Sequence, residues 1–79
     1  MGSALKIRDD LTPSELRRWA RGGSRGRAAA RAYAIANALE GMPRAAAARP
    51  VGMDRQSLRD AVVRYNAEGL EGLRDRPKG

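Results

Sequence analysis

Residues 44–61 read RAAAARPVGMDRQSLRDA, in which an alanine-rich segment is followed by a proline, a glycine and a second helix-forming segment. Pro43 can begin a short Ala-rich helix that runs to about Arg49, where Pro50 disfavours further helix because it lacks an N–H and restricts the residue before it. Residues 51–53 have the composition of a tight turn, and Asp54 is a good N-cap for a second helix. The pattern predicts two helices joined by a short turn.

The spacing within this pair is that of a helix-turn-helix motif. Such a motif needs a small residue where the two helices touch and a glycine in the turn, and here Ala48 precedes Gly52 by four residues. The positions expected to be buried are apolar, namely Ala47, Val51, Met53, Leu58 and Ala61. An ordinary helical hairpin is the alternative, since alanine supplies small apolar positions in any register. The combined match favours the helix-turn-helix.

Two further helices are expected upstream of this pair. Thr12 and Glu15 can form a capping box around Pro13, and the helix that follows, with Trp19 as a core anchor, ends at residues 22–23. Ser24 is a candidate N-cap for a long helix over residues 25–40, whose apolar stripe is Ala28, Ala32, Ile35 and Leu39.

The helix after Asp54 should run from Arg55 to about Ala67 and stop at Gly69, with Leu70 and Leu73 folding back onto the core. No segment alternates as a strand does, so the expected fold is all-α, a bundle of about four helices. We expect a flexible arm over residues 1–10, a helix-turn-helix domain over residues 11–73 and a basic tail over residues 74–79.

Composition excludes several classes of function. A chain of 79 residues is enough for one domain. It has no His and no Cys, which excludes imidazole bases, thiolate nucleophiles, disulfides and the usual zinc sites. We therefore expect no enzyme activity, cofactor, metal or small-molecule substrate. With no long apolar run and no signal-peptide core, we also expect no membrane association and a cytoplasmic, nucleoid-associated location.

Charge points to a polyanionic partner. Lys and Arg number 16 against 9 Asp and Glu, a net charge of +7, and no acidic residue lies between Glu15 and Glu40. Such a surplus on a small domain favours nucleic acid. Double-stranded DNA is the partner expected from the helix-turn-helix, because the second helix of that motif enters the major groove.

The motif assigns roles to particular side chains. Base edges should be contacted from the start of the second helix, because Arg pairs with guanine and Gln with adenine. The candidates for base readout are Arg55, Gln56, Ser57 and Arg59. The candidates for phosphate contact lie in the arginine-rich stretch, the helices and the tail, and they are Arg17, Arg18, Arg21, Arg25, Arg27, Arg31, Arg44, Arg64, Arg74, Arg76 and Lys78. Asp60 is expected to pair with Arg64 at i+4.

Residues 65–77, YNAEGLEGLRDRP, resemble a signature of bacterial insertion-sequence transposases related to mariner elements, in which similar text follows the first helix-turn-helix. Residues 11–15, LTPSE, and residues 52–59, GMDRQSLR, are also similar to that domain. Two positions depart from the family pattern. Pro50 replaces a helix-compatible residue, and Ala61 stands where relatives often carry Trp.

The resemblance implies a homeodomain-like or winged-helix domain that binds the terminal inverted repeats of a mobile element. Family members continue into a second DNA-binding subdomain and a catalytic domain with three metal-binding carboxylates, for which 79 residues leave no room. We therefore expect DNA binding without catalysis, in a fragment of a transposase-like protein or in a stand-alone transcriptional regulator. A homodimer or a catalytic partner domain would add the specificity that so small a domain lacks.

Other classes of binding protein remain to be weighed. A helical protein-interaction or dimerisation module would use the same Ala-rich helices, and its binding would depend little on salt. Single-strand or RNA binding is disfavoured because the three aromatic residues lie on or beside apolar stripes rather than on a stacking surface. A membrane-surface helix over residues 25–39 is disfavoured because alanine is weakly apolar.

Overall fold

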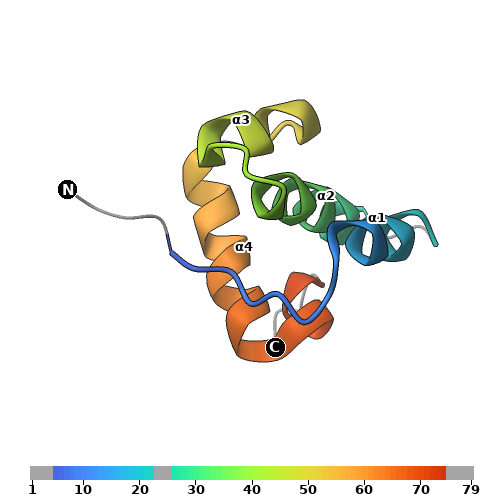
Figure 1. Ribbon diagram of the computed structural model, residues 1–79. Coiled ribbons are helices and arrows are strands. Elements are labelled where there is room, and N and C mark those ends of the chain that lie inside the picture. Colours follow the sequence, from blue (N-terminus) through green and yellow to red (C-terminus); the bar gives the residue numbers. More distant parts are fainter. Residues whose placement is uncertain (1–4, 23–25, 75–79) are drawn as a thin grey trace, which may run out of the picture.

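The computed structural model describes residues 5–22 and 26–74. Its elements follow one another as α1 (Pro13–Arg21), α2 (Arg27–Leu39), α3 (Arg44–Ala48), the 3-10 turn η1 (Arg49–Val51), α4 (Arg55–Glu68) and the 3-10 turn η2 (Gly69–Leu73). Helices α1 and α2 pack on each other, and α4 runs along the opposite side of the bundle beneath α3 (Figure 1). The all-α prediction is confirmed for the described residues, which contain no strand.

Local sequence explains where α1 and α2 begin. Thr12 and Glu15 form the expected capping box, in which the Thr12 hydroxyl accepts from the Glu15 N–H at 3.1 Å and the Glu15 carboxylate accepts from the Thr12 N–H at 2.8 Å. Helix α2 begins at Arg27, two residues later than predicted, because Gly26 precedes it with φ +54°, outside the helical region. Ser24, the predicted cap, lies outside the described residues.

The helix-turn-helix pair forms as the sequence predicts. Helix α3 ends at Ala48, and Pro50 lies in the 3-10 turn that follows. The proline therefore ends the α-helix, and the chain continues directly as a 3-10 turn. Gly52 then adopts a left-handed conformation with φ +75°, and Asp54 caps α4 by accepting from the Ser57 N–H at 2.7 Å. Helix α4 ends at Glu68, one residue beyond the prediction.

The core contains many alanine side chains. Eight of the fifteen buried hydrophobic residues of the described chain are alanines, and the larger ones include Leu16, Ile35, Leu58, Tyr65 and Leu73. Ala47 and Ala48 of α3 are fully buried, so this short helix lies very close to its neighbours. Because alanine side chains are small, α2, α3 and α4 can pack closely together. A core with few large apolar residues can therefore still be filled without voids.

An extended segment over residues 5–8, called here the N-terminal strap, crosses α4 (Figure 1). Ile7 is buried, and Asn66 of α4 accepts from the Arg8 N–H at 2.9 Å and donates to the Lys6 carbonyl at 2.7 Å. The Arg8 guanidinium also donates to the carbonyls of Tyr65 and Asn66 near the end of α4. Residues 5–8, which belong to the segment expected to be a flexible arm, are held against α4 by the buried Ile7 side chain and by these hydrogen bonds.

The chain after α4 folds back as expected from Leu70 and Leu73. Gly69 ends the helix with φ +69°, and Leu73 is fully buried. Gly72 lies so close to α4 that an added Cβ would be 2.3 Å from the Arg64 carbonyl oxygen. Glycine at this position is therefore required by a close approach of two backbones rather than by its own dihedral angles.

Candidate nucleic-acid interface

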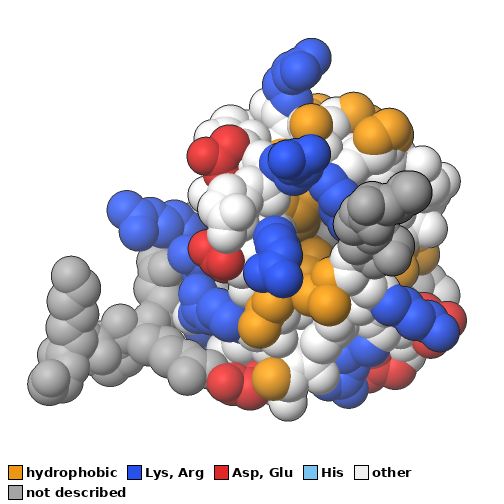
Figure 2. Space-filling view, turned by 90° about the vertical axis from the view of Figure 1, so that its left-hand side faces the viewer, with side chains coloured by type: hydrophobic (Ala, Val, Ile, Leu, Met, Phe, Trp, Pro, Cys, Tyr) orange, Lys and Arg blue, Asp and Glu red, His pale blue; other side chains and the backbone are white. Residues whose placement is uncertain are grey.

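The outward face of α4 is the candidate reading surface. Leu58, Ala61, Val62 and Tyr65 are buried toward the core, which turns the opposite side of the helix toward solvent. Arg55, Gln56 and Arg59 are exposed, as a base-reading role requires. Figure 2 shows the side of the molecule along which α4 runs, with Lys and Arg side chains spread across it and fewer acidic ones between them.

Ser57 differs from the other three predicted base readers. It is exposed, but it lines a hollow on the flank of α4, and its backbone N–H is bonded to the Asp54 cap. The hydrogen bond from Ser57 also holds the pKa of the Asp54 carboxyl below its ordinary value. The Ser57 backbone therefore takes part in the N-terminal cap of α4, and its side chain lies to one side of the outward face.

Two further residues lie on the outward face, and neither is among the four predicted base readers. Asp60 was expected to pair with Arg64, but it instead accepts a hydrogen bond from the Gln56 amide at 3.3 Å. Val63 is exposed one helical turn after Arg59. Both follow Gln56 at helical spacing, at i+4 and i+7, so the periodicity of α4 was the signal that could have found them.

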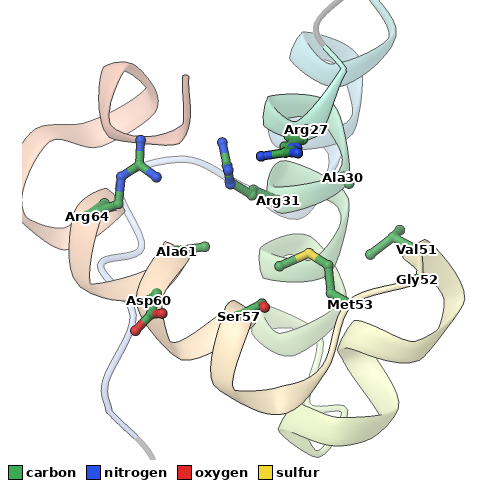
Figure 3. A pocket seen from close by; sticks show the side chains of 10 residues that line it. All are labelled: Arg27, Ala30, Arg31, Val51, Gly52, Met53, Ser57, Asp60, Ala61 and Arg64. Carbon is green, nitrogen blue, oxygen red and sulfur yellow. The ribbon is translucent and has the colours of Figure 1, made fainter. Parts of the chain in front are cut away.

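A hollow of about 440 Å³ lies between α2 and α4 (Figure 3). Arg27 and Arg31 reach into it from α2, and Arg64 faces them from α4. Its floor includes Ala30 and Ala61, so the small side chain at position 61 leaves open space beside the candidate reading helix. The hollow gives this flank of α4 a concentrated positive charge.

Two of these arginines also hold the chain that follows α4. Arg31 donates to the Leu73 carbonyl at 2.7 Å, and Arg64 donates to the Arg74 carbonyl at 2.6 Å. Arg74 in turn makes an ion pair with Glu71 at 3.2 Å and lies over the Trp19 ring. The residues predicted for phosphate contact on this side thus have structural partners as well as positive charge.

Two further predicted phosphate contacts are used within the fold. Arg17 makes a two-point ion pair with Glu40, at 2.6 and 2.9 Å, and donates to Asn37 at 2.8 Å. This pairing lowers the pKa of the Glu40 carboxyl and joins α1 to the end of α2. Arg44 donates to the Leu5 carbonyl of the strap.

The remaining predicted phosphate contacts divide into two groups. Arg18, Arg21 and Arg27 are exposed on α1 and at the start of α2, where an approaching polyanion can meet them. Arg25, Arg76 and Lys78 lie outside the described residues. No helix in the described part of the chain is both long and apolar enough to cross a membrane.

Comparison with known proteins gives a family match over the second half of the chain. Residues 31–79 match the model of the winged helix-turn-helix family, a span that includes α3, the turn and α4. Among the described residues that span contains no strand of a wing, because the chain after α4 packs back as η2. No solved structure matches this chain.

One curated relative is 42% identical over 73 residues, which is 92% of this chain. It is the uncharacterized protein y4pG/y4sC of Sinorhizobium fredii (strain NBRC 101917 / NGR234). The chain spans 38% of the length of that relative.

Proposed function

The chain belongs to the winged helix-turn-helix family, and from this premise we propose that it binds double-stranded DNA in a sequence-dependent way with α4 in the major groove. In this proposal Arg55, Gln56 and Arg59 contact base edges. The exposed arginines Arg18 and Arg21 contact backbone phosphates, and Arg27 contacts a phosphate beside the hollow. DNA binding is the role that the family suggests, and the assignment of residues extends it.

One observation carries this proposal. The outward face of α4 holds two exposed arginines and a glutamine, while the opposite face of the same helix supplies the core. Within the described residues Arg55 and Arg59 take part in no ion pair, so their donors are available to a ligand. A guanidinium can donate two hydrogen bonds to guanine, and the Gln56 amide can pair with adenine.

The surface gives less support to the alternative of a protein-interaction module. The large hydrophobic residues exposed in the described chain are Leu5, Met42 and Val63, which belong to the strap, the loop between α2 and α3, and α4. They belong to three separate elements rather than to one helix face, whereas a stable protein interface needs a contiguous apolar patch. The charge of +7 is better matched by a polyanion than by another copy of the same chain.

The proposed DNA binding can serve one of two biological roles. The module recognises the ends of a mobile element as part of a transposase-like protein, or it recognises an operator as a transcriptional regulator. It carries no catalysis of its own in either role, and a second copy or a partner domain supplies additional specificity. A bound site within terminal inverted repeats would identify the first role, and a bound site at a promoter would identify the second.

The test is selection from a random pool of duplex DNA at two salt concentrations, followed by sequencing of the bound fraction. We expect an enriched motif, together with affinity that falls steeply as salt rises. Salt-sensitive binding without a motif would remove the base-reading role of α4. Absence of binding at both salt concentrations would overturn the proposal. A protein-interaction module would then be the favoured function.

A further inference from the structure

Val63 is an exposed apolar side chain on α4, the helix that also carries Arg55, Gln56 and Arg59. It is 45% exposed, the highest value among the large hydrophobic residues of the described chain. Its neighbour Val62 is 1% exposed and belongs to the core. Val62 therefore lies on the buried face of α4 and Val63 on its exposed face. Val63 contributes much less than Val62 to the packing of the core.

The register of α4 aligns Val63 with the candidate base readers. Gln56, Arg59, Asp60 and Val63 stand at i, i+3, i+4 and i+7, which is the spacing of side chains that recognition helices direct into the major groove. At 1.5 Å of rise per residue, Val63 lies about 10 Å beyond Gln56 along the helix. That distance corresponds to about three base pairs, so each can meet a different part of one site.

The chemistry of the side chain limits what it can recognise there. Arg59, Asp60 and Gln56 offer hydrogen-bond donors and acceptors, whereas Val63 offers two methyl groups. Every base edge in the major groove presents polar atoms, and the C5-methyl of thymine is the apolar group among them. A single valine side chain is also too small to dock a protein.

We propose that Val63 contacts the C5-methyl of a thymine and so determines specificity at one position of the DNA site. This inference rests on the proposed binding of duplex DNA by α4. It adds an apolar contact to a reading surface that is otherwise polar. Asp60, bonded to the Gln56 amide, lies between the apolar contact and the polar one.

The test uses deoxyuridine, which differs from thymidine by the absence of the C5-methyl. Each thymine of the selected duplex is replaced in turn, and the dissociation constants of the wild-type chain and Val63→Ala are measured for every duplex. We expect one replacement to weaken wild-type binding about threefold to fivefold, the effect of one buried methyl group. The same replacement should leave binding by Val63→Ala unchanged.

Two variants serve as controls. Val63→Thr keeps one of the two γ-methyl groups, both of which Val63→Ala lacks, and should retain part of the deoxyuridine effect. Met42→Ala removes a side chain of similar exposure from the loop between α2 and α3, and it should keep the full wild-type effect. Thermal unfolding of each variant establishes that it is folded, which we expect because both side chains are exposed.

The outcomes separate this inference from the proposed function. An equal deoxyuridine effect in the wild-type chain and Val63→Ala would overturn the contact, as would a selected site at which no thymine methyl matters. In both cases sequence-dependent binding by α4 would stand. A wild-type chain that binds duplex DNA without any motif, or does not bind it, would overturn the proposed function together with this inference.

Discussion

The hydroxyl of Tyr65 is buried against the core and has no hydrogen-bond partner among the described residues. A buried polar group without a partner keeps the cost of its desolvation. Burial is also the main reason why the pKa of this phenol is raised above its ordinary value. The ring belongs to the largest fully buried side chain of the described residues, so the hydroxyl and the ring have opposite effects on stability.

Tyr65→Phe should therefore be neutral or should raise the free energy of unfolding by up to about 1 kcal/mol, because it removes the hydroxyl and keeps the ring. Tyr65→Ala should lower it by about 3–5 kcal/mol through the cavity that it leaves. Urea unfolding measures both changes. A loss of about 1 kcal/mol or more in Tyr65→Phe would mean that the hydroxyl has a partner.

Arg55 and Arg27 provide a matched pair for separating base readout from phosphate contact, since each is the first residue of its helix and is exposed. Arg55→Ala should weaken binding to the selected site by about 1–3 kcal/mol and relax preference at one base pair. Arg27→Ala should weaken binding to all sequences and lower the salt slope by about one. Competition binding across a set of single-base variants distinguishes them. Identical behaviour of the two variants would remove the division of roles.

The N-terminal strap and η2 hold α4 from two sides, which makes the end of this helix dependent on segments distant in sequence. The strap is joined to Asn66 and the neighbouring carbonyls, and η2 packs on Arg64 through Gly72. Ile7→Ala should lower the free energy of unfolding by about 2–5 kcal/mol, as expected for a buried isoleucine. Leu5→Ala, an exposed residue of the same strap, should change it little, and an equally small change in Ile7→Ala would show that the strap does not pack.

Gly72→Ala tests the second contact. The added Cβ would meet the Arg64 carbonyl, so η2 must move away from α4, and we expect a loss of about 1–3 kcal/mol of stability. Gly22→Ala is a suitable control, because Gly22 is exposed and has φ −76°. Urea unfolding compares the two. Equal stability of Gly72→Ala and the wild-type chain would contradict the close approach.

Much of the element order could be predicted because its signals are local. Caps, prolines and turn glycines act within a few residues, and they located α1, α3 and α4 to within about two residues, the usual spread of helix ends. The strap was missed because residues 5–8 carry no period, and Ile7 is buried by packing against a helix about sixty residues away. At the interface, exposure of Arg55, Gln56 and Arg59 followed from helical spacing. The partners of Arg17, Arg31 and Arg64 did not, because they depend on tertiary contacts.

The stability of the whole molecule should depend on pH in one range only. The free energy of unfolding should fall in acid and should stay constant around neutral pH. Asp10, Glu40 and Asp54 have lowered pKa values because Arg8, Arg17 and the Ser57 N–H, respectively, bond to their ionised forms. Groups with depressed folded-state pKa values stabilise the fold above their unfolded-state values, and this stability is lost as pH falls through the folded-state values. Stability should therefore decline below about pH 4. With no His and no Cys, it should be constant between about pH 6 and 8.

Urea unfolding at several pH values measures this profile. Glu40→Gln should show a smaller acid-induced loss than the wild-type chain, because the glutamine cannot be protonated in this range. Asp9→Asn is the control, since Asp9 is an exposed carboxylate outside these three contacts. A change in stability between about pH 6 and 8 would contradict the assignment of the titrating groups.

The alanine-built core also has an evolutionary consequence. A fully buried alanine such as Ala32, Ala47 or Ala48 can be enlarged only by pushing helices apart, so few neighbouring sequences keep the fold. The exposed positions 56, 59, 60 and 63 carry no such restriction. Under the role proposed for α4, descendants of this chain can acquire new target sites through substitutions on the outward side of this helix, while its buried side stays almost unchanged.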